Sequence, residues 1–400
     1  MTPVAIAATG IACGLGVGSA SVTAALRAHR SGVRPASAWP AGALPTDVAV
    51  EVSEPVGELD GFPDDRKAAL LARALLDLGR GGPDVPAERR AVFLGTGLSS
   101  VTPRELAEDV YPHVRDGEVD SLAATLDLGR DKVAPRRHEP ARVTAWLARQ
   151  VGATGPGGTS FSACAAAAEA IAEGARAIAR GEADVAWVGG HDSMIHPLGM
   201  LSFQALGALS PAGGRPFDAD RDGFVLGEGA ALIRLERLDL CDRPLGVILG
   251  AGSSLDAYGV TAPHPDGAGA EAAMRRALVD AGLGGGVVDW VNAHATGTPV
   301  GDRAEARAIA RLLGDRVAVS SLKGALGHGL AAAGALELVA TVLAWAGGFT
   351  PGTVGCERID PELDVAVLTT PRDRPPGVVL SNSFGFGGQN VCLALAPEVP

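Results

Sequence analysis

The sequence of 400 residues lacks an apolar run long enough to cross a membrane. Charged residues or glycines interrupt each apolar run before the roughly 20 residues that a membrane-spanning helix requires. Met1 leads directly into PVAIAATG, which lacks the pattern of a secretion signal. We therefore expect neither a membrane helix nor a signal peptide.

Cysteine is scarce, and the five that occur are scattered, odd in number and without CxxC spacing. This pattern argues against a disulfide framework and against a zinc site, so we expect no metal and a cytoplasmic location. The cysteines are Cys13, Cys164, Cys241, Cys356 and Cys392.

Positive charge is also in short supply, because 34 Lys and Arg residues face 46 Asp and Glu residues, which gives a formal net charge of -12. This balance argues against general nucleic-acid binding, although an acidic protein can still carry a local basic patch for an acidic partner. The hydrophobic content of 47% is sufficient for one large core or two medium ones, as in a globular protein.

Apolar runs alternate with amphipathic stretches along the whole chain, and the pattern restarts after Leu240. The strands expected are 3–10, 91–97, 184–190, 229–238, 245–254, 287–294 and 317–321. The helices expected are 18–30, 66–80, 164–181, 270–283, 301–314 and 329–346, followed by a glycine-rich hairpin. This alternation predicts an α/β fold made of two similar halves, 1–240 and 241–400. The long segments 99–150 and 191–228, rich in Pro, Gly and charge, are expected to be functional loops.

Cys164 is the first candidate functional residue, because GTSFSA before it predicts a short buried strand and the residues after it predict a helix. At such a junction the unpaired N–H groups and the positive end of the helix dipole stabilise a thiolate. The small side chains of Ala165 to Ala168 let another backbone approach closely. A small buried core residue is the alternative interpretation of this cysteine.

Two histidines follow strands of the second half in glycine-rich turns, His294 in NAHATGTPVGD and His328 in LKGALGHGLAAAGALE. Lys323 and Glu337 flank the second histidine. The C-terminal hairpin LSNSFGFGGQNVCLALA contains several glycines, whose backbone can approach a ligand closely.

Taken together, these segments resemble the β-ketoacyl synthases, the condensing enzymes of fatty acid and polyketide assembly. The resemblance covers nearly the whole chain in the family's order, through SACAAAAEAI, RGEADVAWVGG, RPFDADRDGFVLGEGA, HATGTPVGD, LKGALGHGLAAAGALE and NSFGFGGQN. It implies the thiolase fold, in which two duplicated halves form a five-layered α-β-α-β-α core, and it implies a dimer.

The resemblance also implies the role of each catalytic residue. Cys164 would hold the acyl chain as a thioester, and its backbone N–H and that of Phe386 would form the oxyanion hole. His294 and His328 would donate hydrogen bonds to the enolate that forms when malonyl thioester loses CO2.

The residues around this centre receive supporting roles from the same resemblance. The buried pair Lys323 and Glu337 would order the His328 turn. Phe384, Gly385, Phe386 and Gly387 would form the gate that admits substrate. Asp218, Arg221 and Asp222 are assigned to structural support of the active-site loop.

The implied partner is an acyl carrier protein, whose phosphopantetheine arm delivers the substrate, so we expect no cofactor bound to the enzyme itself. Arg66 and Lys67 match the family's basic docking position. Arg130, Lys132, Arg136 and Arg137 form a second candidate surface, for which a solvated loop is the alternative.

Residues 99–145 depart from the apolar, aromatic segment expected in a housekeeping synthase, which favours a dedicated polyketide or polyene pathway while leaving fatty acid elongation open. The departure also leaves open whether the dimer is homotypic or pairs with a chain-length-factor-like subunit. Three other activities on this fold remain alternatives: a thiolase, which would need a second cysteine such as Cys392, a chain length factor, which usually lacks the nucleophile, and a non-condensing acyltransferase.

Overall fold

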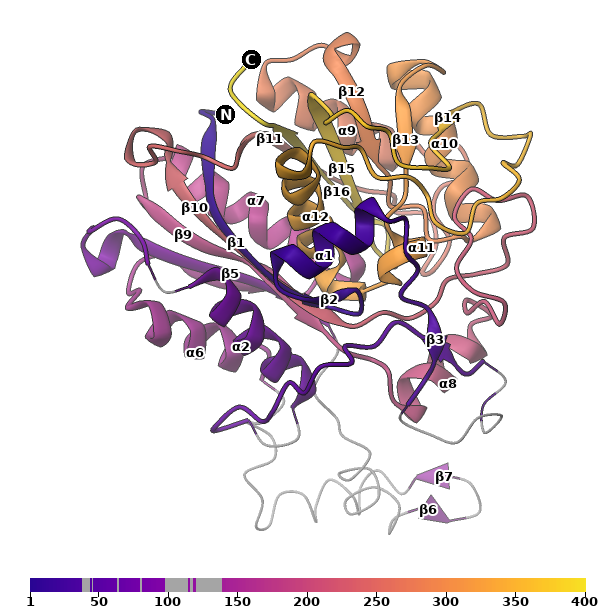
Figure 1. Ribbon diagram of the computed structural model, residues 1–400, viewed down its shortest axis with the longest axis horizontal. Helices are drawn as coiled ribbons and strands as arrows, with labels where there is room; N and C mark the ends of the chain where they lie inside the picture. The colour runs from indigo at the N-terminus through magenta and orange to yellow at the C-terminus, as the bar shows by residue number, and fades with distance from the viewer. Residues whose placement is uncertain are drawn as a thin grey trace.

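The computed structural model describes residues 1–37, 44, 46–62, 65–79, 81–97 and 139–400, together with the backbone of 114–115 and 118–119. Among these residues one sheet contains 12 strands (Figure 1). Its order is β14 (Ala366–Val367), β13 (Ala318–Ser320), β12 (Val288–Asn292), β15 (Val378–Phe384), β16 (Gln389–Ala396), β11 (Gly246–Leu255), β1 (Val4–Cys13), β10 (Gly229–Arg237), β9 (Val185–Asp192), β5 (Arg90–Thr96) and β8 (Gly157–Ser160), and β2 (Gly16–Val17) pairs with β1. Two short pairs lie outside it, β3 (Arg34–Pro35) with β4 (Val48–Ala49) and β6 (Val114–Arg115) with β7 (Glu118–Val119).

The sheet is a duplication, because each half repeats one pairing scheme. In the first half β1–β10 and β10–β9 are antiparallel, and β9–β5 and β5–β8 are parallel. In the second half β11–β16 and β16–β15 are antiparallel, and β15–β12 and β12–β13 are parallel. Antiparallel pairing of β1 with β11, where Val4 faces Ile248, joins the two halves into one sheet.

The helices build three layers around the two halves of the sheet. They are α1 (Ser19–Arg27), α2 (Arg66–Leu78), α6 (Ala141–Val151), α7 (Ala166–Ala179), α8 (Pro197–Ala205), α9 (Ala268–Ala281), α10 (Pro299–Leu313), α11 (Lys323–Leu326) and α12 (Ala333–Gly347). The central layer contains α7 and α12, which share a core with strands of both halves (Figure 1). The helices α2 and α6 cover the outer face of the first half, and α9 and α10 cover that of the second. These are the five layers expected from the resemblance.

The position of a helix in these layers follows from its pattern of apolar residues. In α2 the buried positions include 67, 70, 71, 74, 75 and 78, which form one helical face, and Asp65 caps the first turn by accepting a hydrogen bond from the Ala68 N–H at 3.1 Å. In contrast, α12 is buried on nearly every side. Although Glu337 interrupts it, the stretch Leu330–Gly347 has the length and mean hydropathy of a membrane-spanning helix, but 89% of it is buried inside the protein, as in a core helix.

The structure corrects three expectations about local elements. The segments expected to be long loops contain two helices, α6 and α8. The expected buried strand GTSFSA is β8, which ends at Ser160, lies at the end of the sheet and is only partly buried, and Phe161 after it is 54% exposed. The helix expected from residue 164 begins with a 3-10 turn (Ala163–Ala165) before α7.

Candidate active site

Cys164 lies in the 3-10 turn that connects β8 to α7, and the chain before it is strained. Ala163 has a φ of 47°, a left-handed conformation that costs roughly 1–2 kcal/mol for a residue with a Cβ atom. The hairpin between β15 and β16 packs directly on this turn. A Cβ atom at Gly385 would lie 2.9 Å from the carbonyl oxygen of Ser162 and 3.3 Å from the backbone nitrogen of Cys164, so only glycine fits there.

His328 reaches the sulfur from the second half of the chain. Its backbone is fixed, because its N–H donates to the carbonyl oxygen of Val225 at 2.7 Å and its carbonyl oxygen accepts from the N–H of Gly227 at 3.0 Å. Its Nε2 atom lies 3.1 Å from the Sγ atom of Cys164. The structure therefore brings together two residues that are 164 positions apart in the sequence.

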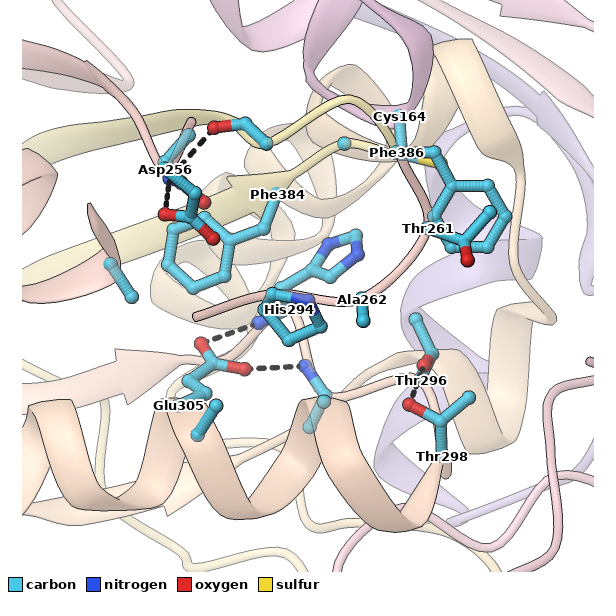
Figure 2. A pocket seen from close by; sticks show the side chains of 18 of the residues that line it. Cys164, Asp256, Thr261, Ala262, His294, Thr296, Thr298, Glu305, Phe384 and Phe386 are labelled. Atoms are coloured by element: carbon cyan, nitrogen blue, oxygen red, sulfur yellow. Dashed lines mark hydrogen bonds between the residues drawn. The ribbon is translucent and has the colours of Figure 1, made fainter. Parts of the chain in front are cut away.

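His294 follows β12, and its position is set by a carboxylate on α10 (Figure 2). The N–H groups of His294 and Ala295 donate to Glu305 at 2.9 and 2.7 Å, and Asn382 Nδ2 donates to the same carboxylate at 2.9 Å. The His294 ring centroid is 5.4 Å from that of His328. The sequence analysis missed Glu305, although its place two turns into the helix that follows His294 was a usable signal.

Lys323 and Glu337 form a buried ion pair beside the two histidines. Only 3% of Lys323 and 1% of Glu337 is exposed, and Lys323 Nζ donates to Glu337 Oε1. Asn292 Nδ2 donates to the other oxygen of Glu337 at 3.2 Å. Burial raises the pKa of Glu337, and the charge of Lys323 opposes that shift. Their burial shows that they are not a solvated pair on the protein surface.

The charge state of the resting site differs from the one expected. Burial raises the pKa of the Cys164 thiol to about 12, against the lowering effects of Lys323 and of the backbone N–H groups of Phe386 and Cys164. Burial, followed by the charge of Lys323, lowers the pKa of both His294 and His328 well below the usual value. The expected stabilisation of a thiolate at this junction is therefore not the dominant effect in the resting enzyme, because desolvation outweighs Lys323 and the two backbone N–H groups. The thiol and both imidazoles are neutral at pH 7.

The glycine-rich hairpin is linked to the loop after β11. Gly387 donates its N–H to the carbonyl oxygen of Val260 at 2.7 Å, and Asp256 donates its N–H to the carbonyl oxygen of Gly388 at 2.9 Å. The Asp256 carboxylate also accepts from Asn390 Nδ2 at 2.8 Å. Gly387 and Gly388 have φ values of 90° and 83°, which other residues rarely adopt. Any movement of this hairpin must therefore involve the loop at Asp256.

Cys164, both histidines and the hairpin line one pocket, which Figure 2 shows from close by. Among the other lining residues are Phe203, Phe224, Asp256, Thr261, Thr296, Thr298, Glu305, Leu330, Phe384, Phe386 and Asn390. Cys392, the second cysteine that a thiolase would need, is not among them and is fully buried in β16.

The expected carrier-docking pair is not a basic surface. Lys67 is only 7% exposed, because it lies on the buried face of α2, and its Nζ atom donates to Thr96 Oγ1 at 3.5 Å. Arg66 is half-exposed, but its Nε atom donates to the buried Glu228 carboxylate at 2.7 Å. The docking prediction is wrong for Lys67 and unsupported for Arg66. The second candidate surface, Arg130, Lys132, Arg136 and Arg137, lies outside the described residues.

Asp218, Arg221 and Asp222 lie in hydrogen-bonded loops beside the site. The Asp218 carboxylate accepts from the N–H groups of Glu357 and Arg358 at 2.9 and 2.8 Å. Arg221 Nη1 donates to Asp360 at 2.7 Å. Asp222 accepts from Ser210 Oγ at 2.5 Å.

Comparisons with known proteins identify the class to which this fold and this pocket belong. Residues 1–240 match the beta-ketoacyl synthase N-terminal domain, and residues 245–357 match the beta-ketoacyl synthase C-terminal domain. The chain belongs to the β-ketoacyl synthase family.

Individual relatives agree with this assignment. The chain is 40% identical over 342 residues to a 3-oxoacyl-[acyl-carrier-protein] synthase 2 of Mycobacterium tuberculosis, a match that covers 82% of this chain and 79% of the relative. Among solved structures it resembles the ishigamide ketosynthase/chain length factor, with a TM-score of 0.85, 31% identity and 99% of both chains covered. It also resembles a beta-ketoacyl synthase from Burkholderia phymatum STM815, with a TM-score of 0.83, 28% identity and 99% of both chains covered. The thiolase fold is thereby confirmed, and the protein is a β-ketoacyl synthase, an acyl-transferring condensing enzyme of fatty acid or polyketide synthesis.

Proposed function

We propose that this enzyme condenses an acyl thioester held on Cys164 with malonyl-acyl carrier protein, releases CO2 and forms a β-ketoacyl thioester two carbons longer. The observation that carries this proposal is a pocket in which one cysteine faces two neutral histidines. The carrier is inferred from the name of the mycobacterial relative. The phosphopantetheine arm arrives on that carrier, so no cofactor of the enzyme is required.

In the first half-reaction the Cys164 sulfur attacks the acyl carbonyl carbon, and the bond from that carbon to the carrier's sulfur breaks. The Cys164 proton ends on the departing carrier thiolate, which leaves as a thiol, while His328 stays neutral with its Nε2–H, 3.1 Å away, directed at the sulfur. The N–H groups of Cys164 and Phe386 lower the pKa of the thiol and are the donors for the oxyanion of the tetrahedral intermediate. Covalent capture divides one difficult reaction into two easier ones.

In the second half-reaction malonyl thioester occupies the pocket, and its carboxylate leaves as CO2. The electrons left on the α-carbon form an enolate, whose oxygen accepts hydrogen bonds from His294 and His328. The enolate carbon then attacks the acyl carbonyl, and the Cys164 sulfur departs as a thiolate, which takes up a proton from water to restore the neutral thiol. Neutral imidazoles suit this step because each can present an Nε2–H, and their lowered pKa values keep them neutral.

The ion pair and the hairpin support these steps. Lys323 and Glu337 lie next to the His328 turn, and the charge of Lys323 lowers the pKa of Cys164 and of both histidines. Phe384 and Phe386 act as the gate, since both line the pocket and are only half-buried.

The strand at one edge of the sheet offers a surface on which a dimer could form. Among the residues that the structure describes, β8 is hydrogen-bonded on one side only, to β5, and the exposed Phe161 follows it. An unpaired edge with exposed apolar surface is a site for pairing with another chain. We expect a homodimer through this edge, and a heterodimer with a chain-length-factor-like subunit is the alternative because one structural relative is a ketosynthase/chain length factor. Since all five cysteines are free thiols, we place the enzyme in the reducing cytoplasm.

The decisive experiment incubates the purified enzyme with a panel of acyl carrier thioesters and malonyl carrier, and measures the intact mass of the products. Products two carbons longer with release of CO2 support the proposal, and the accepted chains distinguish a fatty acid pathway from a polyketide pathway. Transfer of acyl groups without CO2 release would instead identify a non-condensing acyltransferase.

A further inference from the structure

One buried carboxylate near the pocket has no part in the mechanism described above. Asp192 is the last residue of β9, and only 2% of it is exposed. The backbone of Gly97 lies directly against it, since a Cβ atom at Gly97 would be 2.1 Å from Asp192 Oδ2. Burying a charged carboxylate costs free energy unless it is paired or hydrogen-bonded. The hydrogen bonds of Asp192 therefore indicate which segments it holds in place.

Both oxygens of this carboxylate accept backbone hydrogen bonds, one from each half of the protein. Asp192 Oδ1 accepts from the N–H of Ser193 at 2.9 Å, which is a local contact. Asp192 Oδ2 accepts from the N–H of Ala331 at 3.1 Å, across 139 positions of sequence. Ala331 lies three residues after His328, at the start of the segment that continues into α12.

The turn that carries His328 is therefore held at two points. Before the turn, His328 is hydrogen-bonded to Val225 and Gly227 through its backbone. After it, Ala331 is held by Asp192. Between them Leu330 has a φ of 48°, a strained conformation that persists only where the surroundings fix it.

The charge of Asp192 is balanced by a residue first considered for carrier docking. Burial raises the pKa of Asp192, and Lys67 opposes that shift most strongly. Lys67 also contributes to lowering the pKa of the neighbouring buried His191 to about 3, after the larger effect of burial. The positive charge of Lys67 thus acts on two buried side chains, Asp192 and His191.

We propose that Asp192 is a positioning residue for the malonyl step, which holds His328 at its working position through the N–H of Ala331. This inference rests on the proposed function of His328 and deepens it. The carboxylate of Asp192 also has an electrostatic effect on the sulfur of Cys164. The charged or titratable groups around the thiol include Lys323 and Asp192, which affect its pKa, and His294, His328, Asp256 and Glu305, which line the same pocket. Lys323 lowers the pKa of Cys164, and Asp192 raises it.

The two effects of Asp192 give its removal an unusual signature. In Asp192→Asn, the Ala331 contact is weakened, so condensation and CO2 release should fall on the order of 10- to 100-fold, as expected for a misplaced catalytic group. The same change removes a negative charge near the sulfur, so alkylation of Cys164 by iodoacetamide should become faster at a given pH. A structure merely loosened by the substitution would also expose the buried Cys13, Cys356 and Cys392, so alkylation of these three cysteines should stay at the wild-type rate.

The experiment compares wild type, Asp192→Asn and the control Glu236→Gln, which alters another buried carboxylate that is paired with Arg234 and absent from the pocket lining. The Asp192 change is also placed on a Cys164→Gln background, where CO2 release alone is measured. Slower CO2 release with faster alkylation in Asp192→Asn, and neither effect in the control, is the expected result. Wild-type CO2 release or an unchanged alkylation profile would overturn the inference.

A second variant, Lys67→Met, keeps the inference testable if Asp192→Asn does not fold. In Lys67→Met the carboxylate remains but loses its counter-charge, so Asp192 should take up a proton more readily. Condensation should therefore be lost at low pH and recover as the pH rises, relative to wild type. A pH profile identical to wild type would overturn the inference. If Cys164→Gln alone releases no CO2 while wild type condenses, the proposed division between Cys164 and the histidines has failed instead.

Discussion

The Nε2 atom of His328 lies 3.1 Å from the Sγ atom of Cys164, so one hydrogen bond joins the proposed nucleophile of the first half to a histidine of the second. The sulfur is buried, and burial raises its pKa to about 12, which favours the neutral thiol at pH 7. Reactivity therefore depends on geometry across the two halves rather than on a free thiolate.

Acyl capture should occur on one cysteine only. Exposure to an acyl carrier should add one acyl group per chain, and peptide mass mapping should place it on Cys164, since the other four cysteines do not line the pocket. Cys164→Ala is the control and should stay unmodified. Acylation of Cys392 would contradict the assignment.

The raised thiol pKa predicts a steep pH dependence of alkylation. Because burial raises the pKa of Cys164 to about 12, its thiolate fraction should increase about tenfold per pH unit from pH 6 to pH 9 without reaching a plateau. Iodoacetamide labelling at this peptide measures the profile. The unfolded enzyme should level off near a pKa of about 8.5, and a similar plateau in the folded enzyme would show that the sulfur is not desolvated as described.

The two half-reactions should separate in variants. Cys164→Gln removes the nucleophile but imitates the neutral acylated state, so it should lose condensation and still release CO2 from malonyl carrier. Adding His328→Ala should then lower CO2 release by about 100- to 1,000-fold, the usual cost of one donor to a developing oxyanion. If the double variant releases CO2 at the rate of the single variant, another donor carries the step.

The gate should affect rate more than stability. Phe386 lines the pocket and is only half-buried, so Phe386→Ala should slow acyl transfer to Cys164 with a small change in Tm. Stopped-flow acylation and thermal unfolding give the two values. A large fall in Tm with normal acylation would leave this residue a packing role alone.

Removing one member of the buried Lys323–Glu337 pair should lower the free energy of unfolding more than replacing both members. Lys323→Met leaves Glu337 without its partner and should lower the free energy of unfolding by about 3–5 kcal/mol. The double variant Lys323→Met with Glu337→Leu should lose less, because no unpaired charge remains. Urea unfolding compares them, and equal losses would show that the two side chains do not act as a pair.

Periodicity and motif order predicted most of this structure. The strands and the α2, α7, α9, α10 and α12 helices appear within a few residues of their expected positions, because each buries an apolar face that is visible in the sequence. The Lys67 side chain could also have been placed, since it falls on the same helical face as Leu70, Leu71 and Ala74. Its basic character was given more weight than its position in the helix.

Contacts between distant segments were not predictable in the same way. The contact of Asp192 with Ala331 depends on how the two halves pack, which no local pattern specifies. The same holds for the desolvation of Cys164, because the hairpin that covers it is more than two hundred residues away in the sequence. The residue types and motifs thus identified the residues of the candidate site. Their charge states could be derived only from the three-dimensional structure, because these depend on burial.

The duplication of the sheet has a consequence for synthesis on the ribosome. Cys164 and Phe386 are 222 positions apart (386 minus 164), and at about 5–20 residues per second the ribosome needs roughly 10 to 45 seconds to travel between them. During that interval the nascent chain contains the thiol but neither the Phe386 N–H of the proposed oxyanion hole nor, for most of the time, His328. A premature stop between Cys164 and the last hairpin would therefore release a chain with the thiol and without the means to use it.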